Sequence, residues 1–508
     1  MMEALDAESE IRRRTYWLTV TLAVVSVYFV CLLFWFTEGF TFFKFTLDDP
    51  YIHMKLAKNI GLGHYGFNLS QYSAPSSSIL WPFFLAPFST SSYFEFAPLI
   101  INIILSFVLI VLIFKTILDF QFSARNTSFL TLVIIAFVNL FGMTVNGLEH
   151  VLQMIAVVLI FREFSSILKD EKRSICGISL VLAFSICIRY EMLIFWAAIA
   201  CFYLYKRQFK KTFFVSILPL LPAIAFSLYL KSLGLGYLPS SVVAKTAGDS
   251  NFFVNLCVTF YQNATSRQGL GLLVLTGVNV YLFRRTSKVC YANLLVILVP
   301  IALHLMVGKF GWFYRYEIYI LLYTILIFLS LSSQIVFNKC AFFFSAVFLF
   351  WLCEPYIWSV QKLNQAARNI HYQQGITSQF AQKYLSGPIA VNDIGLVGLR
   401  YNDEVLDLWG LASQEALQAR LNSSDFRWVS KLANARGVDV LLIYESWIQP
   451  PSQWKKVGEF VLLENNVVLG GDKVSVFSTE EKVESLREAL RKFNSTIGSA
   501  PIQINILN

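Results

Sequence analysis

Long apolar segments recur along most of this chain, and they constrain its fold more than any other feature. Runs of about 20 mainly apolar residues, the length that crosses a bilayer as a helix, follow one another from Val20 to Trp358. Of the 508 residues, 56% are hydrophobic and only 14% are charged, whereas about a quarter of the residues in a soluble domain carry a charge. The sequence therefore predicts a polytopic α-helical membrane protein.

We predict about 11 transmembrane helices in this region. An acidic head and a triple arginine precede the first span, which is typical of a retained helix rather than a cleaved signal. Ile79 to Phe88 is predicted as a half-span or an interfacial helix. The predicted spans cover residues 16–37, 95–118, 127–145, 150–168, 174–190, 191–205, 212–230, 269–283, 290–307, 317–335 and 340–358.

The basic residues of the short loops predict the orientation. The positive-inside rule places Lys-rich and Arg-rich loops in the cytoplasm, and the predicted inner loops hold many such residues in phase with an odd number of spans. We therefore expect a cytoplasmic N-terminus, with the first long loop and the C-terminal region outside. The net charge of +9 is divided among these loops and does not indicate nucleic-acid binding. The inner-loop residues are Arg12, Arg13, Arg14, Arg125, Lys169, Lys172, Arg173, Lys206, Arg207, Lys210, Lys211, Arg284, Arg285, Lys288 and Lys339.

The composition changes near residue 359. Residues 1–358 are predicted as the transmembrane module, with 46–94 as its first outer loop, and 359–508 as a soluble extracytoplasmic α/β domain. Alternating or continuous apolar patterns predict the strands, and amphipathic patterns predict the helices. The predicted strands are Gly387–Val391, Val438–Ile443, Val461–Leu469 and Val474–Phe477, and the predicted helices cover residues 376–385, 427–436 and 480–493.

Two adjacent carboxylates, Asp48 and Asp49, open the stretch Thr46–Trp81 directly after the first span. One could act as a base while the other holds a metal ion or a neighbouring cation; alternatively, the pair caps the next helix. His53 is either a ligand or a packed core residue, and Ser76–Ser78 reads as a polar turn. No Cys/His spacing resembles a zinc site. The sequence leaves open whether Asp49 and His53 bind a divalent metal ion, and it indicates no other cofactor.

Further ionisable residues lie at the predicted outer ends of the spans, where such groups are costly and therefore candidates for function. Carboxylates combined with Arg and Lys suit transfer from a phosphate-bearing donor, because the cations neutralise the departing phosphate. Each residue also has a structural interpretation: Arg189 and Arg315 could pair with Glu191 and Glu317, Lys245 could be a solvated loop lysine, and Trp312 could be an interfacial aromatic. The residues are Glu149, His150, Arg189, Glu191, Lys245, Trp312, Arg315 and Glu317.

At these positions the chain resembles GT-C-type integral membrane glycosyltransferases. It is most similar to the branch of polyprenyl-phosphate-dependent arabinofuranosyltransferases. The first block of resemblance is DDPYIHMKLAKNI with GHYGFN and SAPSSSILW, and VNDIGLVGLR with VLDLWGLAS lies in the C-terminal region. Between them lie MTVNGLEH, IRYEM, LPSSVVAKT and WFYRYE, so the blocks extend over residues 48 to 412.

The resemblance implies roles for individual residues. Asp48 would be the catalytic base and Asp49 its partner. His53, Arg189, Lys245 and Arg315 would bind the donor phosphate or a metal ion. The substrate-positioning residues would be Tyr51, Glu149, Glu191, Trp312, Glu317 and Asp393.

The expected function is that of an inverting glycosyltransferase. It would move a sugar from a polyprenyl-phosphate donor to a hydroxyl of a cell-envelope glycan or glycolipid, on the outer face of a bacterial inner membrane. The expected partners are this donor, the acceptor and the lipid bilayer, with no nucleic acid. The alternative is a transporter or flippase, or a non-catalytic binder, of a lipid-linked glycan. The sequence does not name the sugar, the acceptor or the oligomeric state.

Overall fold

The structure is a computed structural model that describes residues 2–37, 43–168, 174–246, 252–286, 291–335, 339–423 and 425–507. The chain forms two compact units. The helical unit comprises Met1–Phe36, Leu99–Ile224 and Gly248–Val360. The sheet-bearing unit comprises Thr37–Pro98, Ala225–Ala247 and Gln361–Asn508. The sheet-bearing unit thus includes the whole predicted first outer loop, 46–94, which the sequence groups with the transmembrane module.

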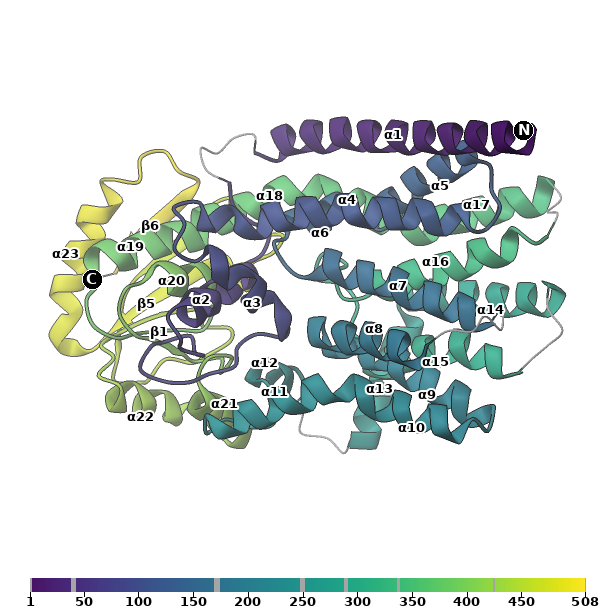
Figure 1. Cartoon of the computed structure of the whole chain (residues 1–508). Coiled ribbons are helices and arrows are strands. Elements are labelled where there is room, and N and C mark those ends of the chain that lie inside the picture. Colours follow the sequence, from purple (N-terminus) through teal and green to yellow (C-terminus); the bar gives the residue numbers. More distant parts are fainter. Residues whose placement is uncertain are drawn as a thin grey trace. The chain divides into compact units, whose positions relative to one another are not determined.

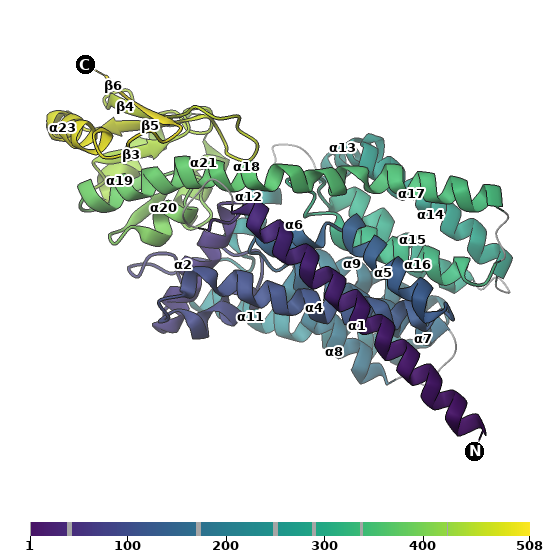
Figure 2. The same cartoon turned by 90° about the horizontal axis from the view of Figure 1, so that it is seen from above.

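Helices packed lengthwise form the helical unit (Figure 1). Figure 1 shows α7 beside α16, and Figure 2 shows α17 running along α14; both pairs are in contact. Two of the helices, α4 and α11, begin or end in the sheet-bearing unit. The helices are α1 (Met2–Phe36), α4 (Ala97–Leu118), α5 (Ala124–Phe137), α6 (Leu140–Val145), α7 (His150–Leu168), α8 (Ile175–Ile188), α9 (Leu193–Tyr205), α10 (Phe209–Ile217), α11 (Leu221–Ser232), α13 (Phe252–Thr265), α14 (Arg267–Thr286), α15 (Tyr291–Val307), α16 (Ile318–Ser332) and α17 (Lys339–Ser359).

Four helical runs in the described residues are long and apolar enough to cross a membrane: Glu8–Phe36, Phe94–Leu118, Phe209–Ser232 and Phe343–Tyr384. Several shorter apolar helices accompany them, so the count of about 11 spans stays a prediction. One predicted span, 127–145, is not a single helix. It breaks between α5 and α6 at Asn139, whose backbone is left-handed (φ 44°) and whose side chain accepts the N–H of Gly142. The helix α13 was not predicted.

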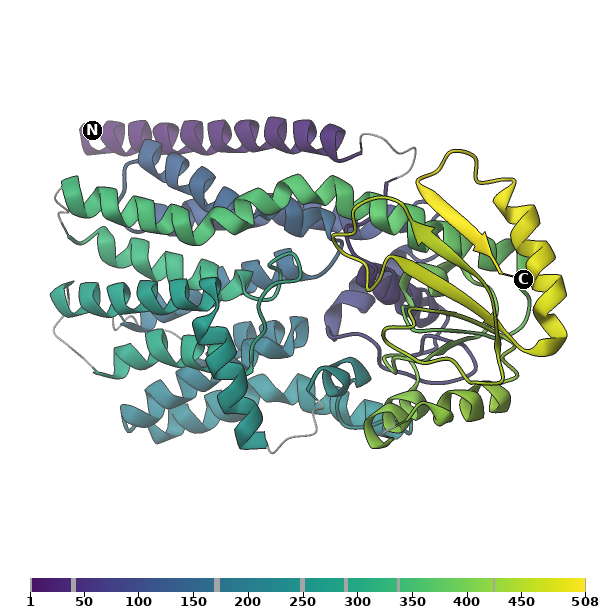
Figure 3. The same cartoon turned by 180° about the vertical axis from the view of Figure 1, so that it is seen from behind.

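A mixed six-stranded sheet is the centre of the sheet-bearing unit, in the order β2-β1-β3-β5-β4-β6. β1 pairs in parallel with β2 and β3, and the remaining neighbours are antiparallel. Figure 3 shows β4, β5 and β6 together, with α23 (Val483–Asn494) lying along them. The strands are β1 (Ile389–Val391), β2 (Val405–Asp407), β3 (Val440–Ile443), β4 (Lys455–Leu462), β5 (Lys473–Ser478) and β6 (Ile502–Ile506).

Both faces of the sheet are covered, which explains why β1 and β3 are apolar without alternation. One face packs with Phe380 of α19 (Ile376–Tyr384), Val397 of α20 (Gly395–Arg400) and Phe493 of α23. The opposite face packs with Ala416 of α21 (Gln414–Asn422) and Val429 of α22 (Arg427–Ala435). The sheet therefore has helices on both sides, as in α/β domains.

The first loop is part of this unit through α2 (Asp49–Gly61), which packs against α20. Pro50 suits the first turn of α2, where its missing N–H would have no partner. Asn68 extends the pairing beyond β2, because its amide donates to Val405 O (2.9 Å) and accepts from Val405 N (3.1 Å). Short helices α3 (Leu80–Leu85) and Ala86–Phe88 occupy the predicted half-span.

Within the C-terminal region, most of the predicted elements are confirmed. The predicted strands at 387–391, 438–443 and 474–477 correspond to β1, β3 and β5, and all three predicted helices are present. The strand predicted at Val461–Leu469 is wrong: β4 ends at Leu462, and a turn around Asn466 follows, with the Asn466 side chain accepting the N–H of Val468 and of Leu469. β2, β6, α20 and α21 were not predicted.

Replacing Gly398 with Ala should destabilise the sheet-bearing unit. A Cβ at Gly398 would overlap the ring of Phe67, which is fully buried. We expect the free energy of unfolding to fall by about 1–3 kcal/mol, the usual cost of overpacking, in chemical denaturation of the purified protein. Gly375→Ala is the control, because its Cβ would meet neighbours only at ordinary distances of 3.6 and 3.9 Å. An equal effect of both substitutions would contradict this packing.

Candidate functional site

The parallel strands β1 and β3 end side by side, and the chain leaves them toward opposite faces of the sheet. β1 continues into α20, which packs on one face, whereas the segment after β3 packs Ile448 and Trp454 on the other. Such a switch point forms a crevice at the carboxyl ends of the strands, where ligands of open α/β sheets commonly bind. Asp393 follows β1, and Tyr444 follows β3. Asp393 and Tyr444 therefore lie where ligands most commonly bind in such a sheet.

Asp48 from the first loop binds at this switch point. Its carboxylate accepts the N–H of Gly395 at 2.6 Å and the N–H of Leu396 at 2.9 Å. Asp48 is the residue before α2, but its side chain does not cap α2. It binds the first turn of α20 instead, so the predicted capping of the following helix is replaced by capping of a helix far away in the sequence. A Cβ at position 395 would overlap the Asp48 carboxyl group.

A hydrogen-bonded network surrounds Asp393. Gln374 Nε2 donates to Asp393 Oδ2 (3.1 Å) and to the Tyr444 hydroxyl (2.6 Å), and this hydroxyl donates to Gln373 Oε1 (2.7 Å). Gln373 and Gln374 lie in a π-helical turn, Ile370–Gly375, and such turns are frequent at functional sites. Gln373, Gln374 and Tyr444 were not predicted: no sequence pattern indicates a π-turn, and Tyr444 is a single aromatic residue after a strand.

The carboxyl groups of Asp48 and Asp393 lie within hydrogen-bonding distance of each other, and one proton can join them. Burial raises the pKa of Asp48 to about 6, although the N–H groups of Leu396 and Gly395 act in the opposite direction. Burial and the negative charge of Asp48 raise the pKa of Asp393 well above its usual value. Asp49 also acts on both groups through its charge. We call Asp48, Asp49 and Asp393 the carboxylate cluster.

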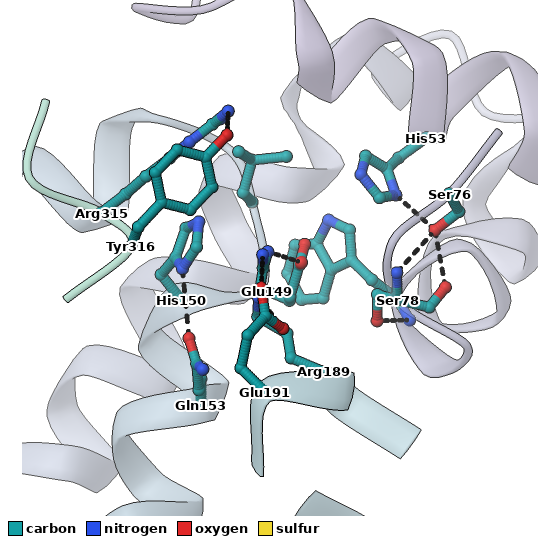
Figure 4. A network of polar contacts seen from close by, with 12 residues as sticks. His53, Ser76, Ser78, Glu149, His150, Gln153, Arg189, Glu191, Arg315 and Tyr316 are labelled. Atoms are coloured by element: carbon teal, nitrogen blue, oxygen red, sulfur yellow. Dashed lines mark hydrogen bonds and ion pairs between the residues drawn. The ribbon is translucent and has the colours of Figure 1, made fainter. Parts of the chain in front are cut away.

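The other predicted residues of α2 differ in accessibility. Asp49 is the first residue of α2 and is half-buried, whereas Tyr51 and His53 are buried. The Tyr51 hydroxyl accepts the N–H of Phe45 at 3.2 Å. Figure 4 shows His53 pointing toward Ser76, with 3.1 Å between Nδ1 and Oγ. Ser76, which the sequence predicts only as part of a polar turn, thus orients the imidazole.

No group of three or more His, Cys, Asp or Glu side chains within the described ranges is arranged to hold a metal ion. The metal ion on Asp49 and His53 stays a prediction. Lys245 belongs to α12 (Ser240–Thr246), but its side chain lies outside the described residues.

In the helical unit, the guanidinium of Arg189 binds two other predicted site residues, Glu149 and Glu191. Arg189 is an extended residue after α8, and it donates to Glu149 Oε1 at 2.6 Å and to Glu191 Oε1 at 2.7 Å (Figure 4). The Arg189 and Glu149 side chains are only 4% and 0% exposed. The expected pairing with Glu191 is therefore present, but Glu149 is the buried partner. His150 contacts Gln153 (3.2 Å).

Arg315 and Glu317 are both buried, and other groups contact them. Arg315 donates to the Tyr316 hydroxyl (3.0 Å) and lies over its ring, as Figure 4 shows. Glu317 accepts the N–H of Gly311 (3.1 Å) and the Tyr356 hydroxyl (3.4 Å). The turn before them is left-handed over four residues, including Trp312, which is 51% exposed. Non-glycine residues rarely adopt this backbone, and such strain is often found at functional sites.

A family model described as a domain of unknown function, DUF8728, matches residues 365–477. The match begins before the glutamines of the π-turn and includes β1, Asp393, β3 and Tyr444. No curated protein matches the chain.

We expect the stability of the sheet-bearing unit to decrease as the pH rises from the usual Asp pKa of 3.8 to about 6. A carboxyl group whose pKa is raised by folding stabilises the folded state while it is protonated, and this contribution is lost as the pH rises through the folded pKa, about 6 for Asp48. Asp393→Asn should make the unfolding temperature less dependent on pH in this range. The exposed Asp472→Asn is the control. Equal pH dependence in wild type and Asp393→Asn would contradict the shared proton.

Removing one member of the Arg189–Glu149 pair should cost more than removing both. A buried charge without its partner destabilises a protein by about 3–5 kcal/mol. We therefore expect Arg189→Gln and Glu149→Gln each to lower the free energy of unfolding strongly, and the double variant to recover part of the loss. Arg427→Gln, which breaks a pair with 91% and 45% exposed side chains, should cost about 0–1 kcal/mol. Strictly additive effects would refute the pairing.

Proposed function

We propose that the chain is an inverting glycosyltransferase that uses a polyprenyl-phosphate sugar donor and a glycan or glycolipid acceptor of the cell envelope. The carboxylate cluster at the ends of β1 and β3 is the observation that supports this most. It provides acid–base groups next to the carboxyl ends of two parallel strands, in a chain whose apolar helices suit a membrane-bound donor. In this proposal the reaction occurs on the outer face of a bacterial inner membrane.

The reaction needs a base that reaches the acceptor. As the acceptor hydroxyl oxygen attacks the anomeric carbon, its proton passes to a carboxylate, and the bond from this carbon to the phosphate oxygen breaks. The electron pair leaves with the phosphate, and a single displacement inverts the anomeric configuration. General bases of this kind typically contribute 10²–10⁴-fold to the rate.

Asp49 suits the role of base better than Asp48. Both oxygens of Asp48 accept backbone N–H groups, and the residue is 8% exposed. Asp49 is half-buried and opens α2, so its carboxylate has more room for an acceptor. The resemblance to GT-C enzymes implies Asp48 as the base, and we propose instead that Asp48 positions the loop while Asp49 removes the proton.

The donor phosphate needs a cation whose charge is not already neutralised. Arg189 is bound by two carboxylates, so its positive charge is offset. We therefore propose that Arg189 fixes the ends of its helices and does not bind the phosphate. Lys245 and Arg315 stay predicted phosphate-binding residues.

Transfer by the purified full chain tests this proposal. The protein in lipid nanodiscs would receive a panel of polyprenyl-phospho-sugars and a cell-envelope acceptor fraction, and new glycosidic bonds would be measured by mass spectrometry. We expect Asp49→Asn to reduce transfer at least 100-fold with little change in unfolding temperature. Asp48→Asn should reduce both transfer and stability. Asp472→Asn is the matched surface control.

Three outcomes would count against the proposal. Undiminished transfer by Asp49→Asn would exclude Asp49 as the base. Movement of the lipid-linked sugar across the bilayer without a new glycosidic bond would favour a transporter or flippase. Donor binding without transfer, for every donor in the panel, would favour a non-catalytic binder.

A further inference from the structure

A separate cavity of about 250 Å³ lies within the sheet-bearing unit. Three segments that are distant in the sequence line it: the first loop at Ser73 and Ala74, the segment from Leu235 to Val243, and helix α21. Most of the lining side chains are aliphatic or aromatic. Among the polar ones are the amides of Gln414 and Gln418. No residue of the carboxylate cluster lines this cavity, and the predicted function does not use it.

Ser240 connects the walls of the cavity through hydrogen bonds. Its hydroxyl is 3.0 Å from the carbonyl oxygen of Ala74 and also hydrogen bonds with the carbonyl oxygen of Leu411. One side chain thus connects the first loop, the start of α12 and the segment before α21. A cavity held in this way is defined by the fold and does not depend on a single mobile loop.

A positive charge lies over the ring of one lining residue. The Lys231 ammonium is 5.5 Å from the centre of the Tyr237 ring, and Tyr237 lines the cavity and is 59% exposed. Lys231 lies in the last turn of α11, at the end of the apolar run Phe209–Ser232, which is long enough to cross a membrane. The lining of the cavity begins four residues after Lys231, at Leu235. The largely apolar cavity therefore has a cation, Lys231, nearby, close to the end of a helix that is long enough to cross a membrane.

We propose that this cavity binds the first isoprene units of a polyprenyl phosphate and that Lys231 binds its phosphate. An apolar cavity of about 150 Å³ is enough for a benzene ring, so this one has room for a branched hydrocarbon segment. The aliphatic lining favours hydrocarbon over sugar, because sugar hydroxyls would lose hydrogen bonds to water there. The charge of Lys231 matches an anionic head group. The inference rests on the proposed function only for the choice of a polyprenyl chain.

Binding of farnesyl phosphate and farnesol to the full chain in nanodiscs tests this site. Val243→Phe narrows the cavity, and we expect it to weaken both ligands about tenfold. Lys231→Gln removes only the charge and should weaken farnesyl phosphate about tenfold while leaving farnesol unchanged. Lys231→Arg should restore phosphate binding. Lys455→Gln, at an exposed lysine on β4, is the control.

Unchanged binding of farnesyl phosphate in both Val243→Phe and Lys231→Gln would overturn the site. Because Lys231 is exposed, its substitution keeps this test valid even if Val243→Phe fails to fold. Equally effective competition by phosphatidic acid would show a general phospholipid site and would overturn the isoprenoid assignment. The transfer assay separates the two proposals: the expected binding pattern without any sugar transfer leaves this site standing and removes the proposed function.

Discussion

The bond between the Asp48 carboxylate and the first turn of α20 determines how the first loop joins the sheet. A carboxylate removed from water is very costly unless hydrogen bonds and a shared proton compensate. Here the N–H groups of Gly395 and Leu396 supply the hydrogen bonds, and Asp393 shares the proton. The first N–H groups of a helix have no partner within the helix. The Asp48 carboxylate therefore gives the N–H groups of α20 an acceptor, and these N–H groups stabilise the carboxylate away from water.

This bond has consequences for the neighbouring residues. It fixes the start of α2, so that Asp49 is held beside Asp48 and Asp393 while keeping partial access to solvent. It also explains why position 395 has no room for a side chain. The network of Gln373, Gln374 and Tyr444 then orients Asp393 from the other side. Asp49, the carboxylate proposed to act on a substrate, is thus a different group from Asp48 and Asp393, which hold the first loop and α20 together.

Local patterns were sufficient to predict many of the elements. The helix at 150–168 was predicted with the bounds of α7, because its apolar run is uninterrupted. The strands at 387–391 and 438–443 were predicted from their apolar runs. Asn139 broke the predicted span 127–145, since a left-handed residue redirects the backbone without changing the mean hydropathy.

The candidate site was harder to predict because its contacts are far apart in the sequence. Asp48 and Gly395 are 347 positions apart, and no pattern within the first loop names its partner. The structural interpretation paired Arg189 with Glu191, two positions further on, whereas the buried Glu149 lies 40 positions away. Asp393 was predicted and Tyr444 was not, although both follow predicted strands; that β1 and β3 lie next to each other could not be read from the sequence.

Hydrogen–deuterium exchange at the start of α20 tests the central claim most directly. The amides of Gly395 and Leu396 donate to Asp48, so their protection reports on this contact. In Asp48→Ala we predict at least about tenfold faster exchange of these two amides, while the amides between β4 and β5 keep their protection as an internal reference. Equal protection of Gly395 and Leu396 in wild type and Asp48→Ala would contradict the account.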